Sequence, residues 1–356
     1  VEIDNPNDRP DFASFTDYVI KDTTGTVDYV NTSGAGTFLT NLIISGEDLT
    51  IGTVNTPNVN IFISAEDSGL NQSGSITING SVTGKNIFVK VHNTDSHALK
   101  IIENDLGDEE DDYELEASLF DIVSDAVISI AATARLIAAQ MVNLAAGSEQ
   151  TKPLIPTLEE LTSKFGEEYA NTLNINFVAV KVGKALIEIK GAIEAAVIRA
   201  LAETLVDVSA MNDNLAAFGL PLAVGVVVSE AGIITRGNAS LKANEGGIFL
   251  KAASHVKLNT HAVSGLLPFT LAVSAVVNNA YVDIKGNTKV NSAGDITAAA
   301  RGNTSITTSA TGPAADEQGG TTPQTAGQSG GFFAVSVAVQ DVFAAVRENA
   351  SANAAA

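Results

Sequence analysis

The chain has 356 residues, of which 45% are hydrophobic but only 5% aromatic, with no Trp. This length allows one large domain or two ordinary ones, and a core of Val, Ile, Leu and Ala suits a narrow interior between strands. The net charge of −21 argues against nucleic acid as a partner, and the lack of cysteine excludes disulfides and thiolate metal sites.

The chain begins at Val1, without a signal peptide or a long apolar stretch of transmembrane type, and its last residues stop inside a repeat. We therefore expect a processed product or an excised part of a larger protein. We expect no membrane insertion in this segment.

The N-terminal part, residues 1–115, consists of short runs in which apolar and polar residues alternate. Examples are NLIISGEDLTIG, NVNIFISAE, GSITINGSVTG and KNIFVKVHN. Alternation with period two predicts strands, and the Gly, Asn and Asp between the runs supply the positive φ of tight corners. Residues 1–115 are therefore predicted to form β-rich coils.

An acidic run, ENDLGDEEDDYELE, occupies residues 103–116. Calcium prefers several carboxylate oxygens in one place, so Asp105, Asp108, Asp111 and Asp112 are the candidate ligands. The run lacks the spacing of an EF-hand loop and of a calcium-binding β-roll. A solvated acidic loop is the simpler interpretation, and no cofactor other than Ca²⁺ is expected.

The middle part, residues 116–219, is rich in Ala and contains one segment with a helical pattern. Thr157 and Glu160 form a capping box, and Leu158, Leu161 and Phe165 follow at helical spacing. We predict a helical insertion near 157–170. The stretches 116–147 and 191–213 fit either a helix or strands, and strands are preferred for 191–213 because the stretch follows a repeat.

The last part, residues 220–356, is the most regular and repeats one phrase, AYVDIKGN at 280–287, which also has copies in the middle part. Each copy has three apolar or small residues at alternate positions, then a basic residue, then Gly or Glu, and most then have Asn. The triplets are Ala185/Ile187/Ile189, Ala231/Ile233/Thr235, Ala280/Val282/Ile284 and Val342/Ala344/Val346, with a fainter copy at Ala126/Ile128/Ile130. The copies follow one another at nearly constant spacing, except that the last interval is longer and contains a Gly/Pro-rich flexible loop at 311–331. This recurrence predicts a regular solenoid.

The predicted fold is therefore all-β, a parallel β-helix with a short helical excursion. Since one coil of such a fold commonly takes roughly 20 to 25 residues, each unit is expected to hold about two coils. Roughly 12 to 14 coils, stacked about 4.8 Å apart, would make a rod about 60 Å long. The basic residues after the triplets, Lys190, Arg236, Lys285 and Arg347, are expected to face water at a corner.

The run GNTKVNSAGDITAAARGN after the strand AVSAVVNNAYVDI resembles the passenger repeats of large bacterial exoproteins, the filamentous-haemagglutinin-like adhesins and related autotransported surface proteins. The resemblance covers residues 220–310 and part of 331–356, while the N-terminal part matches in style. It implies a right-handed parallel β-helix, secreted or at the cell surface, with an adhesive or scaffolding role.

The residues themselves offer little for catalysis. His92, His97, His255 and His261 lack the spacing of metal ligands, so they are interpreted as surface or turn residues. A β-helix lyase or epimerase needs clustered carboxylates near a cation and aromatic platforms for sugars, and aromatic residues are scarce here. We therefore expect no enzyme activity.

The expected function is that of a structural and adhesive segment, a rigid solenoid that presents loops. Its expected partners are a glycan or protein on a host or neighbouring cell, or copies of itself. Two alternatives stay open: a subunit of a self-assembling extracellular filament, and a carbohydrate-active β-helix enzyme.

Overall fold

A computed structural model of the chain describes residues 2–3, 16–21, 25–31, 39–67, 72–94, 122–150, 177–214, 222–264, 269–311 and 331–355. The regular secondary structure in these residues consists of β-strands alone. The strands are β1 (Glu2–Ile3), β2 (Asp17–Lys21), β3 (Thr26–Asn31), β4 (Asn41–Gly46), β5 (Asp48–Asp67), β6 (Gln72–Ile78), β7 (Ser81–Thr94), β8 (Ile122–Ile130), β9 (Arg135–Gln150), β10 (Phe177–Ile189), β11 (Ala192–Ala195), β12 (Val197–Asn214), β13 (Leu222–Thr235), β14 (Ser240–Ala243), β15 (Ile248–Ser264), β16 (Phe269–Ile284), β17 (Lys289–Ser292), β18 (Ile296–Thr311), β19 (Gly331–Val346) and β20 (Ser351–Ala354).

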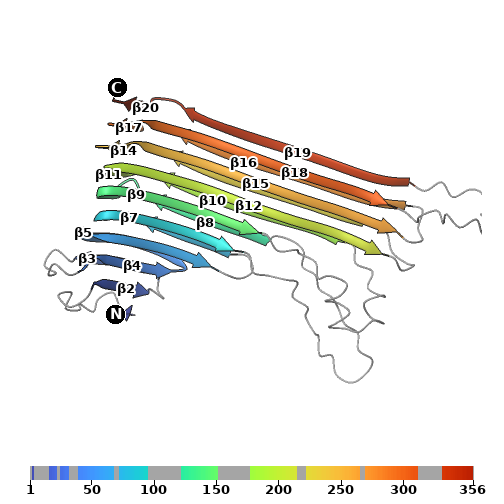
Figure 1. Ribbon diagram of the computed structural model, residues 1–356, viewed down its shortest axis with the longest axis horizontal. Coiled ribbons are helices and arrows are strands. Elements are labelled where there is room, and N and C mark those ends of the chain that lie inside the picture. The colour runs from blue at the N-terminus through green and yellow to red at the C-terminus, as the bar shows by residue number, and fades with distance from the viewer. Residues whose placement is uncertain are drawn as a thin grey trace, which may run out of the picture.

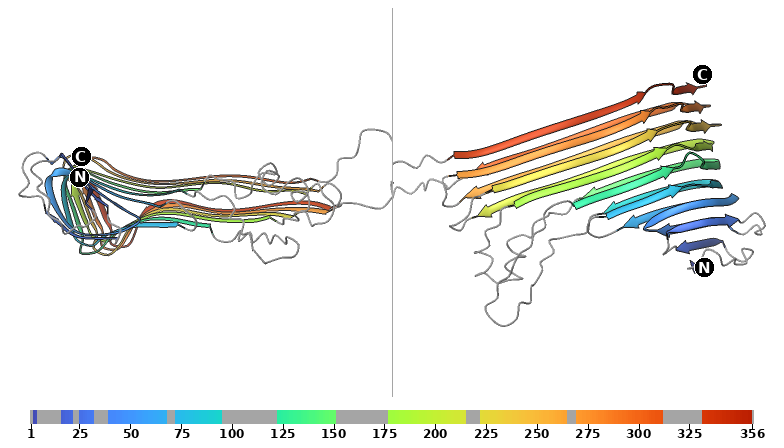
Figure 2. Two further views of the ribbon diagram at one scale, coloured as in Figure 1. Left: turned by 90° about the horizontal axis from the view of Figure 1, so that it is seen from below. Right: turned by 180° about the vertical axis from the view of Figure 1, so that it is seen from behind.

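The strands wind into a parallel β-solenoid, which confirms the predicted fold class. Two broad sheets lie face to face and a short third sheet closes the coil at one end (Figures 1 and 2). The first broad sheet stacks β8, β10, β13, β16 and β19, the second stacks β9, β12, β15 and β18, and the short one stacks β11, β14, β17 and β20. Every pairing between these strands is parallel.

The repeated triplets lie directly above one another, as the sequence predicts. Ala280 pairs with Ala231 on one side and with Val342 on the other. Ala231 in turn pairs with Ala185, and Ala185 pairs with Ala126 of the faint copy. The five copies therefore form one continuous ladder without a register shift.

The predicted coil size is wrong for the repeats, because each unit makes one coil and not two. In the N-terminal part, the hydrogen-bonded residues Asn41, Asn60 and Asn86 of successive coils are 19 and 26 residues apart, close to the expected coil length. In the repeats, the corner residues Asn238 and Asn287 of successive coils are 49 residues apart. The coils are larger because the strands lengthen from 6 residues in β4 to 16 residues in β16. The protein is therefore a flattened solenoid with wide faces and not a narrow rod of many small coils (Figure 2).

Aliphatic columns fill the interior at the closed end. Ile76, Ile128, Ile187, Ile233 and Val282 stack one above another and are each fully buried. Burying a side chain of this kind contributes about 1.5 to 3 kcal/mol, so a column of five is a large part of what holds adjacent coils together. Since inward residues alternate with outward ones along each strand, a slip of one residue would turn the whole column outward.

Farther from the closed end, hydroxyl and amide side chains cross the interior between the two broad sheets. Thr204, Ser229 and Ser254 form a closed triangle of hydrogen bonds, with oxygen–oxygen distances of 2.7 to 2.8 Å. One coil on, the Nδ2 group of Asn278 donates to Thr304 Oγ1 at 2.7 Å. We call this set of buried residues the polar seam. A buried polar group costs free energy unless it is paired, so the seam ties each sheet to one alignment with the other.

The corners after the triplets are built from residues with positive φ. Gly237 and Gly286 have φ of 67° and 77°, and Glu348 takes the same conformation at 59° in the last coil. The Asn side chains that follow form a ladder, in which Asn287 donates to Asn238 at 3.2 Å and Asn349 donates to Asn287 at 3.3 Å.

The segment 191–213 is β11 and most of β12, so the preference for strands is confirmed. The ambiguous stretch 116–147 also contains strands, namely β8 and most of β9. The predicted helix near 157–170 and most of the loop at 311–331 lie outside the described residues.

The corner glycines should differ in their tolerance of a side chain. A Cβ on Gly237 meets nothing within 4 Å, so Gly237→Ala should cost only the left-handed backbone strain, about 1 kcal/mol. A Cβ on Gly286 would lie 2.7 Å from the backbone N of Gly237, so Gly286→Ala should cost clearly more. Urea unfolding of both variants gives the comparison, and equal losses would contradict this account of the corner.

Candidate functional site

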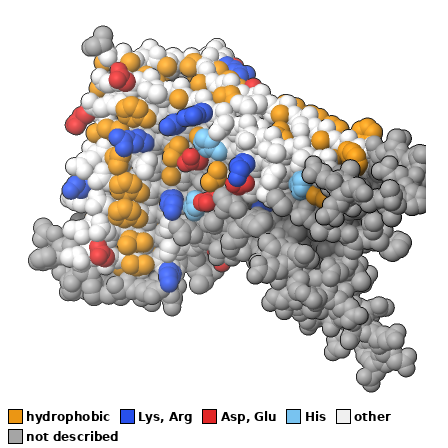
Figure 3. All heavy atoms as spheres, turned by 45° about the vertical axis from the view of Figure 1, so that its right-hand side comes forward, with side chains coloured by type: hydrophobic (Ala, Val, Ile, Leu, Met, Phe, Trp, Pro, Cys, Tyr) orange, Lys and Arg blue, Asp and Glu red, His pale blue; other side chains and the backbone are white. Residues whose placement is uncertain are grey.

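The outward side chains differ sharply between the two broad sheets. On the sheet of β10, β13, β16 and β19, the outward rows in the half farther from the corner are almost entirely apolar, and we call the outer surface of this half the apolar face. Its rows include Leu222, Val224, Val226 and Val228 on β13, Leu271, Val273, Ala275 and Val277 on β16, and Phe333, Val335, Val337 and Val339 on β19. On the face seen in Figure 3, charged and histidine side chains gather in the middle, with a vertical column of hydrophobic side chains to their left and further hydrophobic ones along the upper right margin.

A hollow on the outer surface of β7, β9, β12 and β15 is the clearest candidate for a binding site, and we call it the groove. Its cavity volume is about 340 Å³. The register explains it, because Gly147 of β9 lies between His92 of β7 and Glu203 of β12, and Ala145 lies between Lys90 and Leu201. Small residues on the central strand thus form the floor, and longer side chains on both neighbours form the walls.

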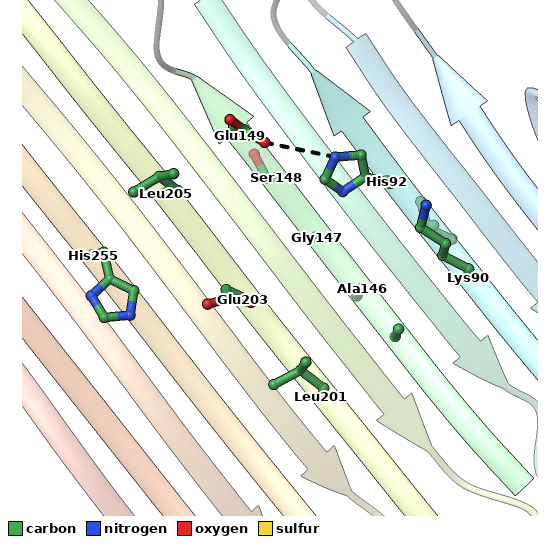
Figure 4. A pocket seen from close by; sticks show the side chains of 12 residues that line it. Lys90, His92, Ala146, Gly147, Ser148, Glu149, Leu201, Glu203, Leu205 and His255 are labelled. Atoms are coloured by element: carbon green, nitrogen blue, oxygen red, sulfur yellow. Dashed lines mark ion pairs between the residues drawn. The ribbon is translucent and has the colours of Figure 1, made fainter.

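The groove combines charged and apolar walls (Figure 4). His92 Nε2 lies 3.9 Å from Glu149 Oε2, and both side chains are about one-third exposed. Glu203 and His255 lie on the strands beyond, together with Leu201 and Leu205. This set offers hydrogen-bond donors and acceptors next to an aliphatic surface. At 3.9 Å the His92–Glu149 pair is too long for a hydrogen bond.

The three described histidines lie on the outside, as expected, and two of them line the same groove. His92 and His255 are far apart in the sequence and both line the groove. His261 lies farther along β15, where its Nδ1 atom is 2.5 Å from Ser309 Oγ. His97 lies outside the described residues.

The basic residues of the corner do not simply face water, because carboxylates of alternate coils bind them in pairs. Glu188 contacts Lys190 of its own coil at 2.7 Å and Arg236 of the next at 3.2 Å. Asp283 contacts Lys285 at 3.2 Å and Arg347 at 3.3 Å in the same way. The basic residues of the corner and these two carboxylates therefore form ion pairs that link neighbouring coils.

A second charged cluster lies on the outside of the β8 sheet, between the corner and the apolar face. The ring of Tyr281 covers Gly232 of the coil below, where an added Cβ would lie 2.4 Å from the ring. Its hydroxyl donates to Glu230 Oε1 at 2.5 Å, and burial together with this bond raises the pKa of Tyr281. Phe343 stacks on the other side of the Tyr281 ring, with 5.6 Å between the ring centroids. Aromatic contacts therefore also link successive coils on the outside of the sheet.

The candidate calcium ligands Asp105, Asp108, Asp111 and Asp112 all lie outside the described residues, so calcium binding stays a prediction. Within the described strands, no three His, Asp or Glu side chains are grouped in a way that could hold a metal ion. The described part also contains no helix long and apolar enough to cross a membrane.

Comparisons do not extend this description. No known protein family, curated protein or solved structure matches the chain. The fold class rests on the geometry of the parallel solenoid, and any function has to be argued from its surfaces.

The sequence does not identify the groove, and it marks His92 and His255 only as surface or turn histidines. Lys90, Gly147, Glu149 and Glu203 come from three different coils, and nothing local in the sequence marks them as neighbours. The one available signal is the small run Ala145-Ala146-Gly147 in a strand, which indicates a hollow on the sheet.

The stability of the chain should depend on pH through Asp125, which lies on β8 near Lys184 and Glu230. Asp125 is half-buried, and burial raises its pKa from the ordinary 3.8, opposed by Lys184 and supported by Glu230. The folded state thus holds the proton to higher pH than the unfolded chain, so deprotonation lowers the free energy of unfolding as pH rises above about 3.8.

We therefore expect Asp125→Asn to be more stable than the wild type at pH 7, with the difference vanishing below pH 3.8. Urea unfolding across this pH range measures it. The exposed Asp295→Asn is the control for loss of one negative charge. An Asp125→Asn variant less stable than wild type at pH 7 would contradict the burial argument.

Proposed function

We propose that the chain is a structural and adhesive segment of a secreted or cell-surface bacterial protein. In this proposal the stacked coils form a stiff scaffold, and the groove binds a glycan or protein on a host or neighbouring cell. The proposal is supported by the resemblance of residues 220–310 to passenger repeats of filamentous-haemagglutinin-like adhesins. The acidic run with Asp105, Asp108, Asp111 and Asp112 is the place where Ca²⁺ would bind.

One observation carries the proposal: the groove exists only because three coils are held in register. His92, Gly147 and Glu203 form one rung across β7, β9 and β12. Inward packing of the same strands fixes these outward positions, since Val91, Ala146 and Ala202 are fully or almost fully buried. A surface of this kind is held rigidly by the core and needs no flexible loop to form it.

The chemistry of the groove suits a ligand rich in hydroxyl groups. Lys90, His92 and His255 can donate hydrogen bonds, and Glu149 and Glu203 can accept them. Leu201 and Leu205 offer an aliphatic surface for the apolar face of a sugar ring or a side chain. The groove is open, so weak binding that is strengthened by many copies on one surface fits it best.

Filling the groove should abolish binding without unfolding the chain. A Cβ on Gly147 lies 2.8 Å from Nδ1 of His92, a side chain that can rotate away, so Gly147→Leu should fold normally. We expect its affinity for the best ligand in a glycan panel to fall about tenfold or more, about 1.4 kcal/mol.

The matched control is Ala299→Leu, the same kind of change on the outside of β18 and away from the groove, which should bind like the wild type. Equal binding by all three proteins would reject the groove as the site. Turnover of a polysaccharide in the panel would favour the alternative of a carbohydrate-active enzyme over an adhesive segment.

A further inference from the structure

On the apolar face, the usual distribution of side chains between the inside and the outside of a protein is reversed. The inward residues of this half of β16 are mostly small or polar: Thr270, Ala272, Ser274, Val276 and Asn278. Its outward residues are all apolar: Phe269, Leu271, Val273, Ala275 and Val277. β13 shows the same reversal, with Ser229 inside and Val228 outside. More hydrophobic side chains therefore face out than in, which is typical of a surface that another molecule covers.

The outward rows of the apolar face continue from coil to coil without a polar side chain. One row consists of valines alone, namely Val123, Val182, Val228, Val277 and Val339. The next row is Val180, Val226, Ala275 and Val337. None of these side chains is buried in the described structure. Since β10, β13 and β16 each pair with a strand on both sides, the face belongs to the middle of the stack and does not depend on either of its ends.

The second broad sheet shows that a flattened solenoid does not require such a face. Gly225 of β13 faces Leu258 and Thr260 of β15 across the interior, so the outward residues around them lie directly behind the apolar face. These outward residues are polar or charged, among them Asp207, Lys257, Asn259 and Thr307. The apolar character is therefore a property of one outer surface only.

We infer that two copies of the chain pack together through their apolar faces, sheet against sheet. A second copy supplies a surface of the same size that is equally flat and equally free of charge. A partner with charged groups would have to desolvate them against valine side chains, which costs free energy. The net charge of −21 also repels an anionic membrane surface. Because the contact is isologous, it closes at two copies.

The apolar face is large enough for a dimer. From Phe269 to Val277 it extends about 30 Å along the strands, and the four strands β10, β13, β16 and β19 span about 19 Å. Each copy would therefore bury about 600 Å², or about 1,200 Å² in all, which reaches the range of specific interfaces. On the side toward the corner, the charged residues Lys184 and Glu230 border the patch, as the polar rim of an interface does.

The dimer goes beyond the proposed adhesive role and does not depend on it. The groove lies on the other broad sheet, on β7, β9, β12 and β15. Packing of the two apolar faces would therefore leave one groove on each outer side of the dimer, where both are free to bind.

Sedimentation velocity tests the association. The wild type should sediment as a dimer, and high salt should strengthen the dimer because it screens the repulsion between two chains of the same net charge. Val226→Lys should raise the dimer dissociation constant about 100-fold or more, because each copy would bury a charge in the contact. The matched control is Asn259→Lys, which adds the same charge to the opposite outer surface and should dimerise like the wild type.

Labelling of single cysteines tests the surface without adding a charge. The chain has no cysteine of its own, so a maleimide probe reports on the introduced thiol. In Val226→Cys the labelling rate should rise about tenfold or more on dilution, because the thiol reacts only in the free monomer. Asn259→Cys is the control and should react equally fast in concentrated and dilute protein.

A monomeric wild type would overturn the inference, and so would larger polymers or equal effects of Val226→Lys and Asn259→Lys. Slow labelling of Val226→Cys at every dilution would show that another part of the same chain covers the face. Flotation of a monomeric wild type with neutral phosphatidylcholine vesicles would assign the face to a lipid surface instead. Glycan binding by Val226→Lys separates this inference from the proposed function, because a lost dimer with retained binding leaves the groove as the binding site.

Discussion

The structure depends on parallel strands stacked in register. Each inward residue lies on the equivalent residue of the coil below, so the columns of Ile and Val that fill the closed end are continuous from β6 to β16. A shift of one residue in any coil would exchange its inward and outward side chains. Every other feature follows from this constraint: the Asn ladder, the ion pairs between coils, and the groove.

The register is specified several times over. Aliphatic packing favours a narrow interior but tolerates sliding along a column of similar side chains. The polar seam does not tolerate such sliding, because a shift would separate Thr204, Ser229 and Ser254 and leave buried hydroxyls unpaired. The corner adds a third check, since the conformation of Gly286 brings it against the backbone of Gly237. Stability and specificity thus come from different residues of the same coil.

The sequence predicts the strands and their register well, because both are local signals. Alternating residues and Gly-Asn corners identify each strand, and the repeated triplet shows that Ala280 and Ala231 are equivalent. The length of a coil is harder to predict from the sequence. A long strand that is apolar on both faces, such as β16, has the same residue pattern as two short buried strands. Without the coil length, the neighbours of His92 could not be found, and so neither could the groove.

The placement of the ends has a mechanical consequence. Strands β1 and β20 both lie at the closed end of the coils, at opposite ends of the stack (Figure 1). Tension between them therefore pulls across the ladders and not along the strands, so the load falls on one pair of coils at a time. The coil between Asn238 and Asn287 would free 49 residues as it peels away, or about 160 Å of extended chain. A protein loaded in this way yields one coil at a time, in shorter steps in its N-terminal part and longer ones in the repeats, and absorbs a sudden pull gradually.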